Sequence, residues 1–185
     1  MVRCEDLNIS FFHITKNAGS SIEDWLKNNA DGDVYDGDLR HAPPKDLDNL
    51  FDDYGWSFCC IRNPWDRVVS WYLYHKRHKL LDCGFEEYLK QASDKGLNGL
   101  KYARFPEHQM FHINRVDYCV RYENLVEDFK VVQKKVNCFE PLGIMNTSPN
   151  KKGRYLEYYT KDEYINMVGD YFKIDLDVTD YSFGD

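Results

Sequence analysis

The stretch that decides the fold of this chain is Ile9-Ser10-Phe11-Phe12-His13-Ile14-Thr15-Lys16-Asn17-Ala18-Gly19-Ser20-Ser21. Its first half, residues 9–14, is a short apolar run rich in residues that favour strands, and it predicts a buried strand. A turn of small residues follows. Beyond it, Ser20 and Glu23 have the three-residue spacing of a capping box, which predicts the start of a helix. The apolar residues of that helix fall on one face: Ile22, Trp25 and Leu26.

A second strand and helix repeat this layout downstream. Residues 56–61 form another apolar run, which predicts a buried strand that ends at Arg62. Asn63 is suited to cap a helix, Pro64 to its first position and Asp66 to its first turn. The residues expected on the buried face of this helix are Val68, Val69, Tyr72 and Leu73.

The rest of the chain continues the alternation of strands with helices. The further elements expected are a helix at 85–92, a strand at 116–120, a helix at 125–136 and a helix at 161–172, with loops at 31–53 and 141–153. Strands that alternate with helices indicate an α/β fold with a central, mainly parallel β-sheet flanked by helices. At 185 residues, the chain is expected to form a single domain, residues 1–185.

The charge and the cysteines exclude several classes of protein. Acidic residues outnumber basic ones by 31 to 24, for a net charge of −7, which argues against a nucleic-acid partner. Residues 31–53 hold eight of the aspartates. The six cysteines contain no C-x-x-C pair, so no metal site is expected. No apolar leader and no run of about 18 apolar residues is found, which predicts a cytoplasmic protein without a membrane partner.

The turn at residues 15–20 has the features of an anion-binding loop. A strand that leads through small residues to a helix N-terminus presents backbone N–H groups and the positive end of the helix dipole. Small residues at 18–20 let a phosphate or sulfate approach, Lys16 adds a cation, and Ser20 and Ser21 add hydroxyl donors. The Walker pattern G-x-x-x-x-G-K-[ST] is absent. Taken alone, an ordinary capped turn explains this stretch equally well.

The second strand ends in a candidate of the same kind. Arg62 lies at the carboxyl end of the strand, where parallel α/β folds bind ligands, and an arginine there can contact a phosphate through two N–H groups. Ser70 follows about two turns into the helix. The alternative for Arg62 is a salt bridge at the helix entry. Two such loops indicate a ligand with two separated phosphate-like groups.

Two motifs carry a family resemblance. Residues 12–21 resemble the 5′-phosphosulfate loop of sulfotransferases that use 3′-phosphoadenosine 5′-phosphosulfate (PAPS), and residues 60–72 resemble their 3′-phosphate motif. Other segments that look like the family are 121–129, 145–149, 158–160 and 181–183. The chain is most similar to carbohydrate sulfotransferases, including the heparan sulfate 2-O-sulfotransferase type. This resemblance implies a three-layer fold like that of the P-loop NTPases.

The resemblance also implies roles for individual residues. Lys16 would contact the oxygen that bridges phosphate and sulfate, while Arg62 and Ser70 would hold the 3′-phosphate. The residues expected around the 5′-phosphate are Asn17, Ala18, Gly19, Ser20 and Ser21. A basic loop would close over the donor or, equally, be a solvated surface loop: Lys151, Lys152, Gly153 and Arg154. Arg67 is interpreted as a structural ion-pair partner.

Sulfuryl transfer to a hydroxyl also needs a base. The resemblance implies His41, because the 2-O-sulfotransferase type has its base in a similar Arg–His context; the alternative is a surface histidine in an acidic loop. Nearby carboxylates would raise the pKa of His41. The other histidines have different expected places: His13 inside the first strand as a packed residue that shapes the loop, His75 and His78 at a solvated helix end, and His108 and His112 in a segment near the substrate.

The predicted reaction is therefore in-line transfer of a sulfuryl group from PAPS to a hydroxyl acceptor, with release of adenosine 3′,5′-bisphosphate and without a metal. The acceptor would be a carbohydrate or a small soluble molecule. Members of the family in the secretory pathway carry a membrane anchor, so a chain of this kind is expected to be of bacterial or viral type. The alternatives are a kinase-like nucleotide-binding enzyme and a non-catalytic module that binds the nucleotide.

Overall fold

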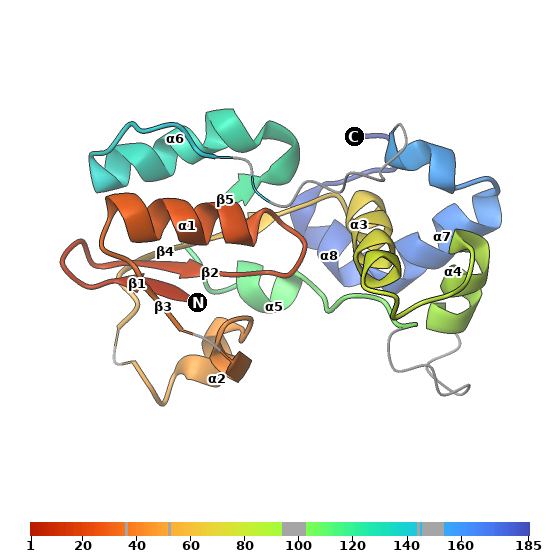
Figure 1. Ribbon diagram of the computed structural model, residues 1–185, viewed down its shortest axis with the longest axis horizontal. Coiled ribbons are helices and arrows are strands. Elements are labelled where there is room, and N and C mark those ends of the chain that lie inside the picture. Colours follow the sequence, from red (N-terminus) through yellow and green to blue (C-terminus); the bar gives the residue numbers. More distant parts are fainter. Residues whose placement is uncertain (36, 52, 94–102, 144, 146–153) are drawn as a thin grey trace. The chain divides into compact units, whose positions relative to one another are not determined.

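The computed structural model describes residues 1–35, 37–51, 53–93, 103–143, 145 and 154–185 (Figure 1). The chain divides into two compact units. Unit 1 comprises Met1–Arg62 and Gln109–Thr147, and unit 2 comprises Asn63–His108 and Ser148–Asp185. The β-sheet belongs to unit 1, and the described elements of unit 2 are helical. The single domain spanning residues 1–185 stays a prediction.

The sheet of unit 1 has the strand order β3-β1-β2-β4-β5. Its strands are β1 Val2–Cys4, β2 Ile9–Phe12, β3 Asp33–Val34, β4 Trp56–Ile61 and β5 Tyr118–Arg121. Strands β2, β4 and β5 run parallel, which confirms the parallel sheet predicted from the sequence. Strand β1 was not predicted, and it pairs antiparallel with both β2 and β3. The sheet is therefore mixed, with a parallel centre that brings the ends of β2 and β4 to the same edge.

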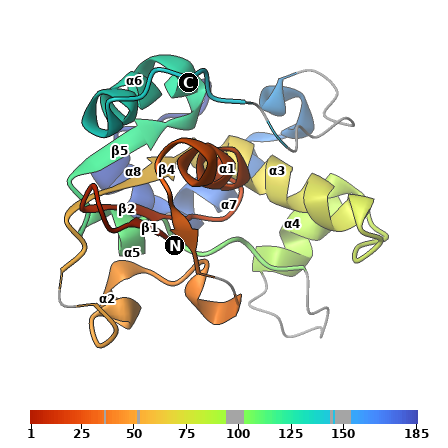
Figure 2. The same ribbon diagram turned by 60° about the vertical axis from the view of Figure 1, so that its left-hand side comes forward.

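Two helices of unit 1 pack on one face of this sheet, α1 Gly19–Asn29 and α6 Leu125–Val136 (Figures 1 and 2). Ile22 and Leu26 of α1 are completely buried against apolar side chains of the strands, as the sequence predicts. The Trp25 ring meets the Phe129 ring of α6 edge-on, with their centres 5.0 Å apart. Burial of such side chains is what holds the two helices on the sheet.

The acidic stretch 31–53 is more structured than the loop expected from its composition. It contains β3, a 3₁₀ turn at Gly37–Leu39 and the short helix α2 Pro44–Leu47. Val34 pairs with Val2 of β1, and Leu47 is completely buried. These apolar residues fold the stretch back onto unit 1, while its described aspartates remain exposed.

Unit 2 contains α3 Pro64–Arg77, α4 Phe85–Ser93, the 3₁₀ turn η3 Tyr155–Tyr158, α7 Asp162–Tyr171 and α8 Lys173–Thr179. The predicted start of α3 is confirmed, because the Asn63 side-chain oxygen accepts the Trp65 N–H at 3.1 Å and Pro64 is the first helical residue. On its expected face, Val68 and Val69 are completely buried. Helix α8 was not predicted. None of the described helices is both long and apolar enough to span a membrane.

Candidate active site

The turn between β2 and α1 is built differently from the capping box predicted for it. Helix α1 begins at Gly19, and its N-cap is Ala18, which has no side-chain capping bond. Ala18 has a φ of 57° and Lys16 a φ of 70°, so the backbone turns through two left-handed residues. The capping-box prediction is wrong because Glu23 binds other side chains. The backbone N–H groups at the start of α1 nevertheless lie at the end of this turn, which is the placement that an anion site requires.

A histidine ring lies directly over the first residue of α1. A Cβ atom added at Gly19 would lie 1.9 Å from both Cδ2 and Nε2 of His13. His13 is buried, which confirms its interpretation as a packed residue that shapes the loop. Glycine is therefore required at position 19 by this close approach rather than by its backbone angles.

The side chain of Asn17 anchors the turn to the sheet. It is completely buried, and its Nδ2 donates to the Cys60 carbonyl at 2.8 Å and to Gln109 Oε1 at 2.6 Å. The side-chain amide of Asn17 is therefore engaged within the protein, and its contact with the 5′-phosphate stays a prediction. Ser21 is also buried, and its Oγ accepts the backbone N–H of Met145 at 2.8 Å. Ser20 is half-buried in the first turn of α1.

Arg62 reaches from the end of β4 to this turn. Its Nη1 donates to the carbonyl of Lys16 at 2.8 Å, and its guanidinium lies 3.8 Å from the centre of the Tyr122 ring. Arg62 is buried, and it belongs to unit 1 with the turn. The structure therefore brings together Lys16 and Arg62, which the sequence places in two separate anion loops.

The remaining residues predicted to bind the donor belong to unit 2. Ser70 is buried in α3, within unit 2, and Arg67 of the same helix donates to the Glu107 carbonyl. Arg154 is exposed at the start of η3. Lys151, Lys152 and Gly153 lie outside the described residues. The roles of Ser70 and of the basic loop stay predictions.

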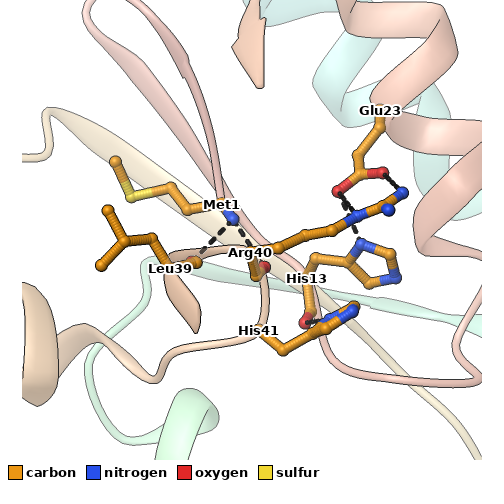
Figure 3. Close-up of polar contacts among 6 residues, drawn as sticks. All are labelled: Met1, His13, Glu23, Leu39, Arg40 and His41. Carbon is orange, nitrogen blue, oxygen red and sulfur yellow. Dashed lines mark hydrogen bonds and ion pairs between the residues drawn. The ribbon is translucent and has the colours of Figure 1, made fainter. Parts of the chain in front are cut away.

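His41 is held by the same turn (Figure 3). Its Nδ1 lies 3.1 Å from the carbonyl oxygen of His13, and the two rings meet edge-on with their centres 4.4 Å apart. The carbonyl can only accept, so Nδ1 carries the proton and Nε2 keeps its lone pair. A half-buried imidazole in this tautomer can take up a proton at Nε2.

Glu23 connects α1 to the segment that carries His41 (Figure 3). One of its oxygens accepts from His13 Nδ1 at 2.6 Å, and the other accepts from Arg40 Nη2 at 2.5 Å. Arg40 Nε adds a third contact at 3.2 Å. The amino group of Met1 donates to the carbonyls of Leu39 and Arg40, at 3.2 and 2.6 Å. Arg40 is thus tethered at its side chain and at its backbone, immediately before His41.

These contacts determine the charges of the cluster. Burial lowers the pKa of His41, and the neighbouring His13 lowers it further. The expectation of a raised pKa for His41 is wrong, because the raising effect of Glu23 is smaller than that of burial. Burial also lowers the pKa of His13, despite its hydrogen bond to Glu23. Burial acts to raise the pKa of Glu23, but hydrogen bonds from His13 and Arg40 lower it to about 2. At neutral pH, His41 is therefore an uncharged base beside an ionised carboxylate.

The other histidines differ in part from expectation. His75 is buried, and its Nδ1 lies 3.0 Å from the Trp71 carbonyl, so its assignment to a solvated helix end is wrong. His78 is exposed, as predicted. His108 pairs with Asp175 at 3.7 Å in unit 2, and His112 is buried in α5 Met110–Ile113 of unit 1. Their place near a substrate stays a prediction.

Two contributors to the cluster were not singled out from the sequence. From the sequence, Glu23 is assigned only to a capping box, and Gln109 is assigned no role. The signal available for Glu23 was its position one turn into a helix that follows a buried histidine. Within the described part of the chain, no group of three or more His, Cys, Asp or Glu side chains is placed to hold a metal ion.

Comparisons with known proteins agree with the sequence motifs. The sequence model of the sulfotransferase family matches residues 1–182. An uncharacterized protein of Archaeoglobus fulgidus is 37% identical over 107 residues, which are 57% of this chain and 87% of that protein. No solved structure matches the chain significantly. The resemblance drawn from residues 12–21 and 60–72 is thereby confirmed at the level of the family.

We expect Gly19→Ala to destabilise the protein by about 1–3 kcal/mol, because the new methyl group would overlap the pinned His13 ring. The measurement is the free energy of urea unfolding, monitored by circular dichroism. Gly143→Ala is the control, since a Cβ there has nothing within 4 Å. Equal stability of the two variants would contradict the packing of His13 on Gly19.

We expect Glu23→Gln to cost most stability at neutral pH and less in acid. The carboxyl pKa falls from its ordinary value of 4.5 to about 2 in the folded protein. Its stabilisation is therefore complete above pH 4.5 and is lost as the pH falls toward 2. The gap between the two values is worth about 3 kcal/mol.

Urea unfolding at pH 7, 4.5 and 3 measures this loss. Glu127→Gln is the control, because Glu127 forms an exposed pair with Lys130 and is expected to contribute little. A stability deficit of Glu23→Gln that stays constant across this range would show that the carboxylate charge is not what matters.

Proposed function

The chain belongs to the sulfotransferase family, and on that premise we propose that it transfers a sulfuryl group from PAPS to a hydroxyl acceptor. The observation that carries the proposal is the turn after β2. Its backbone provides the carbonyl of Lys16 to Arg62 and the carbonyl of His13 to His41. One short segment thus positions the two cationic residues proposed to bind the donor, Lys16 and Arg62, and the proposed base, His41.

The donor would be held by its two anionic ends. The N–H groups at the start of α1 and the ammonium of Lys16 suit the 5′-phosphosulfate. The guanidinium of Arg62 suits the 3′-phosphate, because an arginine can bind two phosphate oxygens at once. The stacking of Arg62 on Tyr122 and its bond to the Lys16 carbonyl restrict the motion of this side chain before any ligand arrives.

The chemistry assigned to the chain is an in-line displacement. As the acceptor oxygen attacks sulfur, its proton passes to Nε2 of His41, and the bond between sulfur and the phosphate oxygen breaks. Lys16 and the N–H groups of the turn stabilise the charge that grows on the leaving oxygen. The products are a sulfate ester and adenosine 3′,5′-bisphosphate, with the proton on His41 released to water.

We expect Lys16→Ala to lower transfer of labelled sulfate from PAPS by about 10²- to 10³-fold, through loss of charge stabilisation. His41→Ala should lower it by about 10²- to 10⁴-fold. In the wild type the rate should fall in acid with a pKa below 6.5, because only neutral His41 accepts a proton. That acid limb should be absent from His41→Ala.

The control is Lys27→Ala, since Lys27 is exposed in the last turn of α1. ATP with Mg²⁺ in place of PAPS should give no phosphorylated product, and a kinase-like activity would count against the proposal. Undiminished sulfate transfer by His41→Ala would remove this histidine as the base.

The acceptor is proposed to be a neutral or cationic hydroxyl compound, either a carbohydrate or a small molecule. The segment that carries His41 exposes several carboxylates: Asp31, Asp33, Asp38, Asp46, Asp48 and Asp53. Arg115 forms an ion pair with Asp48. Arg40, a basic residue of this segment, forms an ion pair with Glu23 of α1. The surplus of negative charge should repel polyanions.

An acceptor screen with mass-spectrometric detection of the added sulfate tests this preference. Neutral sugars and alcohols are expected to be sulfated faster than a highly sulfated glycan, most clearly at low ionic strength where charges are least screened. A preference for the sulfated glycan would overturn the proposed role of the acidic segment.

A further inference from the structure

Gln109 occupies the point where the β2–α1 turn meets the end of β4. It precedes α5 and is completely buried. Its Oε1 accepts from Asn17 Nδ2 at 2.6 Å and from the backbone N–H of Arg62 at 2.9 Å. Its Nε2 donates to the backbone carbonyl of Arg62 at 2.8 Å. One carboxamide therefore binds both loops that the proposed function assigns to the donor.

This carboxamide acts on Arg62 as a neighbouring strand would. Strand β5 pairs with β4 up to Ile61 and Arg121, and the pairing ends there. The carboxamide of Gln109 then takes both the N–H and the carbonyl of Arg62, which are the groups that a further strand residue would bind. The backbone of Arg62 is thus held beyond the last paired residue of the sheet.

The same carboxamide closes a ring of contacts with the turn. Asn17 links Gln109 to Cys60 of β4, and Arg62 Nη1 returns to the carbonyl of Lys16. The turn and the end of β4 are therefore joined at three places within unit 1. Buried hydrogen bonds in such a network hold geometry closely, because an unsatisfied buried group is costly.

We propose that Gln109 is a positioning residue that sets the spacing between the anion site of the β2–α1 turn and the guanidinium of Arg62. A ligand with two anionic groups gains affinity only when both sites are already at the correct separation. Without Gln109, each of the two sites would still be present, but the distance between them would no longer be held constant. This inference rests on the proposed function, since it takes adenosine 3′,5′-bisphosphate as the ligand that bridges both sites.

The test compares ligands with one and with two phosphates by calorimetry. Gln109→Met fills a similar volume but forms none of the three hydrogen bonds. We expect the substitution to weaken the affinity for adenosine 3′,5′-bisphosphate by about tenfold or more. The affinities for adenosine 5′-monophosphate and 3′-monophosphate should each fall by less than about threefold. A role in stability alone would not produce this difference between ligands.

Gln133→Met is the matched control. Gln133 is a buried glutamine of α6 in the same unit, and its Nε2 donates to the Glu140 carbonyl at 2.7 Å, away from the turn. It should lower thermal stability without changing the preference for the bisphosphate. If Gln109→Met does not fold, Gln109→Asn replaces it, since the side chain stays polar but is one methylene too short to reach both Asn17 and Arg62.

The outcomes separate the two ideas. A wild-type protein that does not bind adenosine 3′,5′-bisphosphate would overturn the proposed function, and this inference with it. A wild type that binds it, together with a Gln109 variant that keeps full affinity or loses all three ligands equally, would overturn only the positioning role. Selective loss of the bisphosphate supports both.

Discussion

A buried carboxylate must be paired, and the pairing of Glu23 organises much of unit 1. Because its oxygens bind His13 and Arg40, the His13 ring is held over Gly19 and the segment of His41 is held against α1. His41 in turn donates from its Nδ1 to the backbone carbonyl of His13. The position of His41, the start of α1 and the otherwise acidic segment thus all depend on one side chain.

The charge state of the site follows from local burial rather than from the charge of the whole chain. A net charge of −7 and eight aspartates in residues 31–53 suggest a protonated histidine. In the folded protein, burial and the neighbouring His13 have the larger effect on the pKa of His41 and lower it. The described aspartates of residues 31–53 are exposed, where water and salt screen them. Composition therefore misjudged the protonation of the one histidine assigned to catalysis.

Local patterns were informative where a segment depends on its own residues. The apolar runs predicted β2 and β4, and Asn63 with Pro64 predicted the start of α3. The capping box failed because Glu23 binds other partners, namely His13 just beyond the end of β2 and Arg40. Strand β1 is only three residues long, Val2–Cys4, and its identity depends on pairing with β2 and β3, so no local period could reveal it.

The sequence by itself determined the alternation of strands with helices, the two family motifs at the ends of β2 and β4, and membership of the sulfotransferase family. These properties are local, because they depend on apolar periodicity, turn residues and motif spacing. Only the tertiary structure decided that Gln109 joins the two motifs and that a neutral His41 rests on the turn. The physical reason is that hydrogen-bond partners and burial depend on residues as far apart in the chain as Asn17 and Gln109, which meet only in the folded protein.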